Sequence, residues 1–145
     1  MSWVVAQTVL MVAVIGTWFA PPKIHGGIVV EVVAALLAVI GAFIFFAART
    51  VMGGSFTVRP QPRAGGELVT SGPFRFVRHP IYLSLLLFFT GLSLDHSWTG
   101  LALTGALAVL WAAKARVEER NLRARFPAYA DYSRRVRYRL IPFVY

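Results

Sequence analysis

The residues best suited to chemistry fall in two short stretches of this sequence. In the first, Arg78, His79 and Tyr82 lie at the start of an apolar run. In the second, Glu118 and Glu119 follow another apolar run by a few residues. A carboxylate can accept hydrogen bonds from hydroxyl groups or an ammonium, arginine can pair with a carboxylate through two parallel hydrogen bonds, and tyrosine offers an aromatic face to a cation. These residue types are suited to bind a charged small molecule.

Four apolar segments must position these residues. They comprise residues 3–20, 28–48, 81–94 and 98–113. A helix that crosses a bilayer needs about 20 residues, and the first two segments meet this length. Only three residues separate the last two segments, which is typical of a tight helical hairpin. The sequence therefore predicts an all-α membrane protein with about four transmembrane helices, the fourth extending into the cytoplasm.

The whole chain, residues 1–145, is expected to form a single membrane domain. Residues 1–55 supply two transmembrane helices, and residues 56–145 supply a cofactor-binding loop, the helical hairpin and a C-terminal cytoplasmic segment. The first apolar segment has no positive charge before it, and WFAPP is a poor cleavage site, so we expect a retained helix rather than a signal peptide. The chain has no cysteine, which excludes thiolate catalysis and Cys-ligated metals.

The distribution of Lys and Arg predicts the orientation in the membrane. Of the 15 Lys and Arg residues, all but Lys23 fall in residues 49–80 and 114–139. By the positive-inside rule both basic segments, and therefore both termini, face the cytoplasm. Because these arginines flank membrane helices, contact with a lipid bilayer explains the charge better than nucleic-acid binding does. His25 and His96 have no suitably spaced partners, so no metal site is expected.

The hairpin should bring the two reactive stretches together, because the cytoplasmic ends of its helices are neighbours. An ordinary ion pair with interfacial anchors would explain a single Arg–Glu contact. However, five such groups converge beside residues 49–80, a connection rich in Gly and Pro and long for a structureless loop. This convergence favours a binding site at the cytoplasmic face.

Two motifs carry a resemblance to a known family. LVTSGPFRFVRHPIYLS (68–84) and EERNLRARFPAYADYSRRVRYRLIP (118–142) resemble the signature of the isoprenylcysteine carboxyl methyltransferase and phospholipid methyltransferase superfamily. In that family an R-H-P-x-Y-x-G element precedes E-E-x-x-L and F-G-x-x-Y-x-x-Y. The resemblance covers residues 56–145. Ser84 and Pro127 stand where the family pattern has glycine.

The resemblance implies an integral membrane methyltransferase that binds S-adenosylmethionine without a Rossmann sheet. By this resemblance the cofactor-binding residues are Val69, Gly72, His79, Pro80, Tyr82, Glu118, Glu119 and Tyr129, and the catalytic residues are Arg78, Glu119 and Arg135. The implied partner is a lipophilic methyl acceptor from the bilayer. A non-catalytic binding or assembly protein and an NADPH-dependent reductase are the rival interpretations.

The residues leave the acceptor class open. Methyl transfer from a sulfonium is an in-line displacement that needs alignment and exclusion of water. A carboxylate acceptor needs only an arginine to orient it, whereas an amine acceptor must first lose a proton to a nearby Glu or His. Because Glu118 and Glu119 lie beyond the apolar span, we expect their removal to weaken cofactor binding at little cost in folding free energy.

Overall fold

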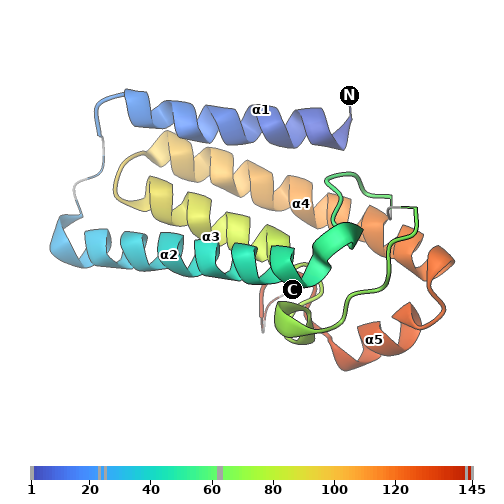
Figure 1. Cartoon of the computed structure of the whole chain (residues 1–145). Helices are drawn as coiled ribbons and strands as arrows, with labels where there is room; N and C mark the ends of the chain where they lie inside the picture. Colours follow the sequence, from blue (N-terminus) through green and yellow to red (C-terminus); the bar gives the residue numbers. More distant parts are fainter. Residues whose placement is uncertain (1, 23, 25, 62–63, 143, 145) are drawn as a thin grey trace.

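Every regular element is helical in the computed structural model, which describes residues 2–22, 24, 26–61, 64–142 and 144. The longer helices are α1 (Trp3–Gly16), α2 (Gly27–Met52), α3 (Pro80–Leu94), α4 (Trp98–Arg125) and α5 (Tyr129–Arg135). The short 3-10 turns are η1 (Thr17–Phe19), η2 (Gly53–Ser55) and η3 (Gly72–Arg75). In the bundle α1 packs on α4, α4 on α3, and α3 on α2 (Figure 1). Lys23 and His25 lie outside the described residues.

The hairpin of α3 and α4 forms as the sequence predicts, and local residues explain its ends. Pro80 starts α3, where its missing N–H removes no intrahelical hydrogen bond. The side chain of Ser97 caps α4 by accepting a hydrogen bond from the backbone N–H of Gly100 at 3.1 Å. α4 then continues beyond its apolar part and ends at Arg125, two residues before Pro127.

Small residues bring α2 and α3 into close contact. A Cβ atom at Gly41 of α2 would clash with the backbone of Ser84 and Phe88, and one at Gly91 of α3 would clash with the backbone of α2. Ser84 is fully buried at this contact, which accounts for a small residue there. Close packing of small residues is a common means of helix association in membranes. It holds the start of α3 firmly beside the end of α2.

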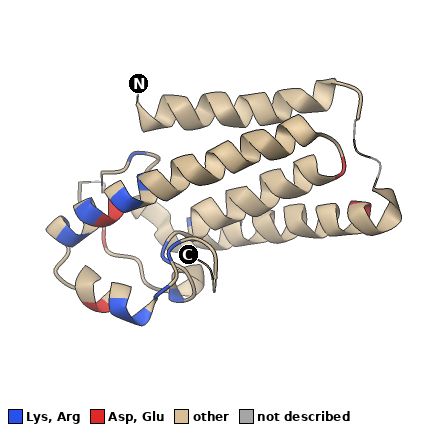
Figure 2. Cartoon of the chain, turned by 180° about the vertical axis from the view of Figure 1, so that it is seen from behind, with Lys and Arg blue, Asp and Glu red and all other residues tan. Residues whose placement is uncertain are grey.

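Two helical stretches, Gly27–Ser55 and Trp98–Arg125, are long and apolar enough to cross a membrane, and Trp3–Phe19 and Pro80–Leu94 are shorter apolar helices. The 15 residues of α3 span about 22 Å, which is less than a hydrocarbon core of about 30 Å. Large apolar side chains such as Val39 and Phe43 of α2 are more than 60% exposed, as lipid contact requires. The described Lys and Arg residues gather at one end of the bundle, which we call the basic end (Figure 2).

Candidate active site

The C-terminal segment after α5 folds back against the start of α3 at the basic end. The backbone N–H groups of Arg78 and His79 donate to the carbonyl oxygens of Tyr138 and Arg139, both at 2.9 Å. The guanidinium of Arg78 follows the same segment, because its Nη1 donates to the carbonyl oxygens of Val136 and Arg137 at 2.8 Å. The tail therefore forms one side of the site.

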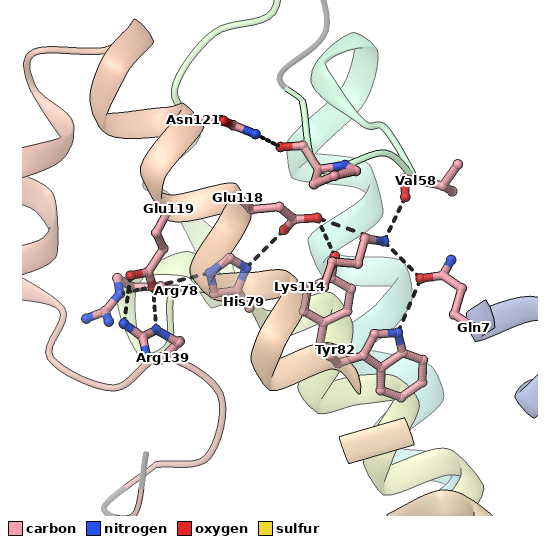
Figure 3. Close-up of polar contacts among 12 residues, drawn as sticks. Gln7, Val58, Arg78, His79, Tyr82, Lys114, Glu118, Glu119, Asn121 and Arg139 are labelled. Carbon is pink, nitrogen blue, oxygen red and sulfur yellow. Dashed lines mark hydrogen bonds and ion pairs between the residues drawn. The ribbon is translucent and has the colours of Figure 1, made fainter. Parts of the chain in front are cut away.

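Glu119 joins three parts of the chain in a buried ion-pair cluster (Figure 3). Its Oε1 accepts from Nε of Arg78 at 2.8 Å and from Nε of Arg139 at 2.9 Å, and its Oε2 accepts from Nη2 of Arg139 at 3.0 Å. The side chain of Glu119 is 4% exposed. The expectation that its removal costs little folding free energy therefore does not hold, because the tail covers this carboxylate and both cations would lose their partner.

His79 lies between the two glutamates. Its Nδ1 is 3.4 Å from Oε2 of Glu118, and its Nε2 is 3.3 Å from Oε1 of Glu119. Burial by itself lowers the pKa of His79, but hydrogen bonds to the two carboxylates and their charges outweigh burial, so that its pKa lies above the usual 6.5. With a carboxylate at each ring nitrogen, the protonated imidazolium is the form that satisfies both contacts.

This arrangement predicts a pH-dependent contribution of His79 to stability. A raised pKa in the folded state means that the contribution is fully present below pH 6.5 and is lost as pH rises through the folded-state value. We expect the thermal midpoint of the detergent-solubilised protein to fall as the pH rises from 6.5 through the folded-state pKa of His79. His79→Gln should flatten this part of the profile. A wild-type profile that is unchanged or rising there would contradict a charged His79.

Glu118 differs from Glu119 because it faces open space. Its Oε1 accepts a hydrogen bond from the Tyr82 hydroxyl and lies 3.9 Å from Nζ of Lys114. Its side chain is 15% exposed and borders two small pockets. Glu118 is therefore the carboxylate that a bound molecule can reach.

The two pockets share a wall, which is made of Met52, Thr57, Phe74, Arg78 and Glu118. The first, of about 110 Å³, lies beside the loop segments 55–61 and 66–69 and is also lined by Phe126, Tyr129 and Tyr132. The second, of about 70 Å³, lies between the end of α2 and the start of α3 and is lined by Phe56, Ile81 and Tyr82 among others. Two ligands placed in these pockets would meet at Arg78 and Glu118.

Two polar groups at the first pocket have hydrogen-bonding capacity left over. The hydroxyl of Tyr129 is buried and has no hydrogen-bond partner among the described residues. Burial raises the pKa of Tyr129, so this hydroxyl stays protonated and available as a donor. Nη2 of Arg78 likewise donates to none of the described residues, although Nε and Nη1 do. An unpaired buried hydroxyl such as that of Tyr129 is a sign of a site for a ligand.

The structure places the predicted site residues in different parts of this region. Val69, Tyr129, Arg78 and Glu118 line the first pocket, and His79, Pro80, Tyr82, Arg78 and Glu118 line the second. Glu119 borders neither pocket. Gly72 has a φ of +57° and starts η3, so it shapes the loop. Arg135 is exposed on α5, and the structure does not bring it to the cluster.

Sequence reasoning missed Arg139 and Lys114. Arg139 donates to both carboxylate oxygens of Glu119, although it was not among the predicted site residues. Its signal in the sequence was its place before the terminal Leu-Ile-Pro, but several neighbouring arginines share that region. Lys114 is 1% exposed although it is charged, and in the sequence it is only the first charge after an apolar run.

A bundle of apolar helices that carries a charged site at one end is the architecture of a membrane-embedded protein. The sequence model of the phospholipid methyltransferase family matches residues 29–128, more than half of the chain. The chain therefore belongs to this family, which is part of the superfamily of integral membrane methyltransferases related to isoprenylcysteine carboxyl methyltransferase.

Individual relatives have varied names. The chain is 42% identical over 77 residues to the cobalt-zinc-cadmium resistance protein CzcN of Cupriavidus metallidurans, which covers 50% of this chain and 35% of that protein. It is 32% identical over 134 residues to a Delta(14)-sterol reductase of Mus musculus, which covers 82% of this chain and 32% of that protein. The chain thus spans about a third of the length of these relatives.

Proposed function

We propose that this protein is a membrane methyltransferase that uses S-adenosylmethionine and methylates a lipophilic acceptor reached from the bilayer. The observation that carries the proposal is the junction at Arg78 and Glu118 between two pockets in different places. One pocket lies beside the loop that follows α2, and the other lies between the end of α2 and the start of α3. Such a junction suits a reaction between a water-soluble donor and a membrane-embedded acceptor.

The residues of the first pocket fit S-adenosylmethionine, which supplies an electrophilic methyl group on a sulfonium. Glu118 offers a carboxylate to its ammonium or ribose hydroxyls, and the buried hydroxyl of Tyr129 offers a donor. The rings of Phe74 and Phe126 supply faces for the adenine or the sulfonium. The free volume of the pocket is below the usual 300–1,000 Å³ of ligand sites, so binding requires the surrounding side chains to rearrange.

The charges around the site support an acceptor with an anionic group. Four basic side chains surround two carboxylates: Arg78, His79, Lys114 and Arg139 around Glu118 and Glu119. Arg78 borders the second pocket as well as the first, and its Nη2, which donates to none of the described residues, is available to orient a carboxylate or a headgroup phosphate. A carboxylate acceptor needs no further base. For an amine acceptor, Glu118 is the group placed to take the proton, because both nitrogens of His79 already face carboxylates.

Methyl-labelled S-adenosylmethionine tests the proposal and separates the two acceptor classes. Purified protein is incubated with the labelled donor and lipids extracted from its host, and the label in the lipid fraction is measured. We expect time-dependent transfer that S-adenosylhomocysteine inhibits. Label released by mild base identifies a carboxyl ester, and label retained in an amine headgroup identifies phospholipid N-methylation. No transfer into any lipid fraction, with protein that still binds the donor, would argue against a lipid acceptor.

We further propose that the basic end faces the cytoplasm, with both termini on that side. The support is the grouping of the described Lys and Arg residues at this end. Single cysteines can report it cleanly because the chain has none of its own. A cysteine at position 65 or 130 should react only with a cytoplasmic reagent, and one at position 96 only with an external reagent. Labelling of positions 65 and 130 from opposite sides would overturn the orientation.

A nicotinamide-dependent reductase is the second candidate function. The similarity to a Delta(14)-sterol reductase over 82% of the chain favours it. The family match and the paired glutamates beside Arg78 and His79 support the methyl donor instead. The two cofactors differ enough for a direct binding measurement to separate them.

A further inference from the structure

Lys114 carries a buried charge and lines neither of the two pockets. It lies on α4 one turn before Glu118 and is 1% exposed. A buried ammonium is costly unless its N–H donors find partners. The groups that accept hydrogen bonds from Lys114 therefore indicate its role in the structure.

Two of these partners come from distant parts of the chain (Figure 3). Nζ of Lys114 donates to Oε1 of Gln7 on α1 at 2.8 Å and to the carbonyl oxygen of Val58 at 2.7 Å. Its charge also lies 3.9 Å from Oε1 of Glu118 and 5.2 Å from the centre of the Tyr82 ring. One ammonium thus connects the first helix, the loop and the carboxylate that faces the pockets.

The loop contact has a direct consequence for the first pocket. Val58 does not border this pocket, but its neighbours Thr57 and Arg59 do. Asn121, also on α4, donates to the carbonyl oxygen of Pro60 at 2.9 Å, so α4 holds this part of the loop at two points. Fixing the carbonyl of Val58 therefore fixes the orientation of the residues that form the pocket wall.

Gln7 of α1 accepts one of the hydrogen bonds of Lys114. Its Oε1 also accepts from Nε1 of Trp111 at 3.3 Å, so a single amide oxygen serves two donors of α4. α1 lies outside the residues that the family model matches, and it otherwise consists largely of apolar side chains. A glutamine in such a helix needs a polar partner, and Lys114 provides it.

From this geometry we infer that Lys114 is a positioning residue that Gln7 holds in place, so that α1 helps to shape the cofactor pocket. Lys114 acts through Val58 on the loop wall and through Glu118 on the ligand-facing carboxylate. This inference rests on the proposed function for the identity of the cofactor. The order of the loop can be measured without any ligand.

The test compares Gln7→Leu with Thr8→Leu, a matched loss of a polar side chain at an exposed position of α1. Lys114→Met is compared with Arg120→Met, which removes an exposed charge from the same helix. Two readouts are taken in detergent: hydrogen exchange of the segment 56–61 without ligand, and affinity for S-adenosylhomocysteine. We expect Gln7→Leu and Lys114→Met to exchange faster in that segment and to bind about 10-fold more weakly. Both controls should match the wild type.

A rescue variant separates positioning from general destabilisation. Gln7→Glu keeps an acceptor oxygen for Lys114 and should restore loop protection and affinity, whereas a merely structural role would not require an acceptor there. Unchanged exchange and affinity in Gln7→Leu and Lys114→Met would overturn the inference, as would a failure of Gln7→Glu to rescue either readout. If the wild type does not bind S-adenosylhomocysteine, the proposed function fails, and the exchange measurement still decides the role of Lys114.

Discussion

Glu119→Gln is expected to lower the free energy of unfolding by about 3–5 kcal/mol, because it breaks a buried ion-pair cluster by removing one partner. Arg78 and Arg139 both donate to this carboxylate, and His79 contacts it at 3.3 Å. A neutral amide of the same size keeps the shape but leaves the guanidinium groups without a counter-charge. The tail that holds Arg139 should then detach from the start of α3.

Glu118→Gln is the matched control, since it makes the same chemical change at the neighbouring position. Glu118 borders both pockets and is more exposed than Glu119, so this variant should lose cofactor affinity with a smaller loss of stability. Thermal unfolding and titration with S-adenosylhomocysteine, both in detergent, measure the two effects. Equal stability of both variants, or a greater loss in Glu118→Gln, would contradict the roles assigned to the two glutamates.

Arg78→Lys is expected to reduce turnover about 100-fold, because a misplaced reacting group can cost that much in rate. The guanidinium uses Nε for Glu119 and Nη1 for the carbonyl oxygens of Val136 and Arg137. An ammonium keeps the charge, but it cannot make these contacts and also present a donor to the pockets. Labelled methyl transfer and affinity for S-adenosylhomocysteine are measured together.

These two measurements distinguish the possible roles of Arg78. If Arg78 orients the acceptor, as we propose, turnover falls while affinity for S-adenosylhomocysteine stays close to the wild-type value. A parallel loss of both would instead assign the arginine to the carboxylate of the cofactor. Wild-type values of both would make Arg78 an interfacial anchor.

The sequence predicts the helices and the hairpin of α3 and α4 well because local signals decide them. The apolar runs determine α2 and α4, Pro80 begins α3, and Ser97 caps α4 after a connection of three residues. Since a short connection forces neighbouring helices to be antiparallel, the meeting of His79 with Glu118 and Glu119 follows from the hairpin alone. This part of the candidate site required no long-range information.

The rest of the site depends on contacts that no local signal specifies. The tail turns back so that the carbonyl oxygens of Tyr138 and Arg139 meet the N–H groups of Arg78 and His79, and this register selects Arg139 rather than Arg135 for Glu119. The burial of Lys114 likewise requires α1 and the loop to close over it. In the sequence, each of these residues is one basic residue among many.

Binding of a methyl donor by this membrane protein can be measured without knowledge of the acceptor. The measurement is a calorimetric titration of the detergent-purified protein with S-adenosylhomocysteine and, separately, with NADPH. We expect saturable binding of S-adenosylhomocysteine that Glu118→Gln weakens, and no binding of NADPH. Saturable binding of NADPH without binding of S-adenosylhomocysteine would contradict the proposed function and identify a reductase.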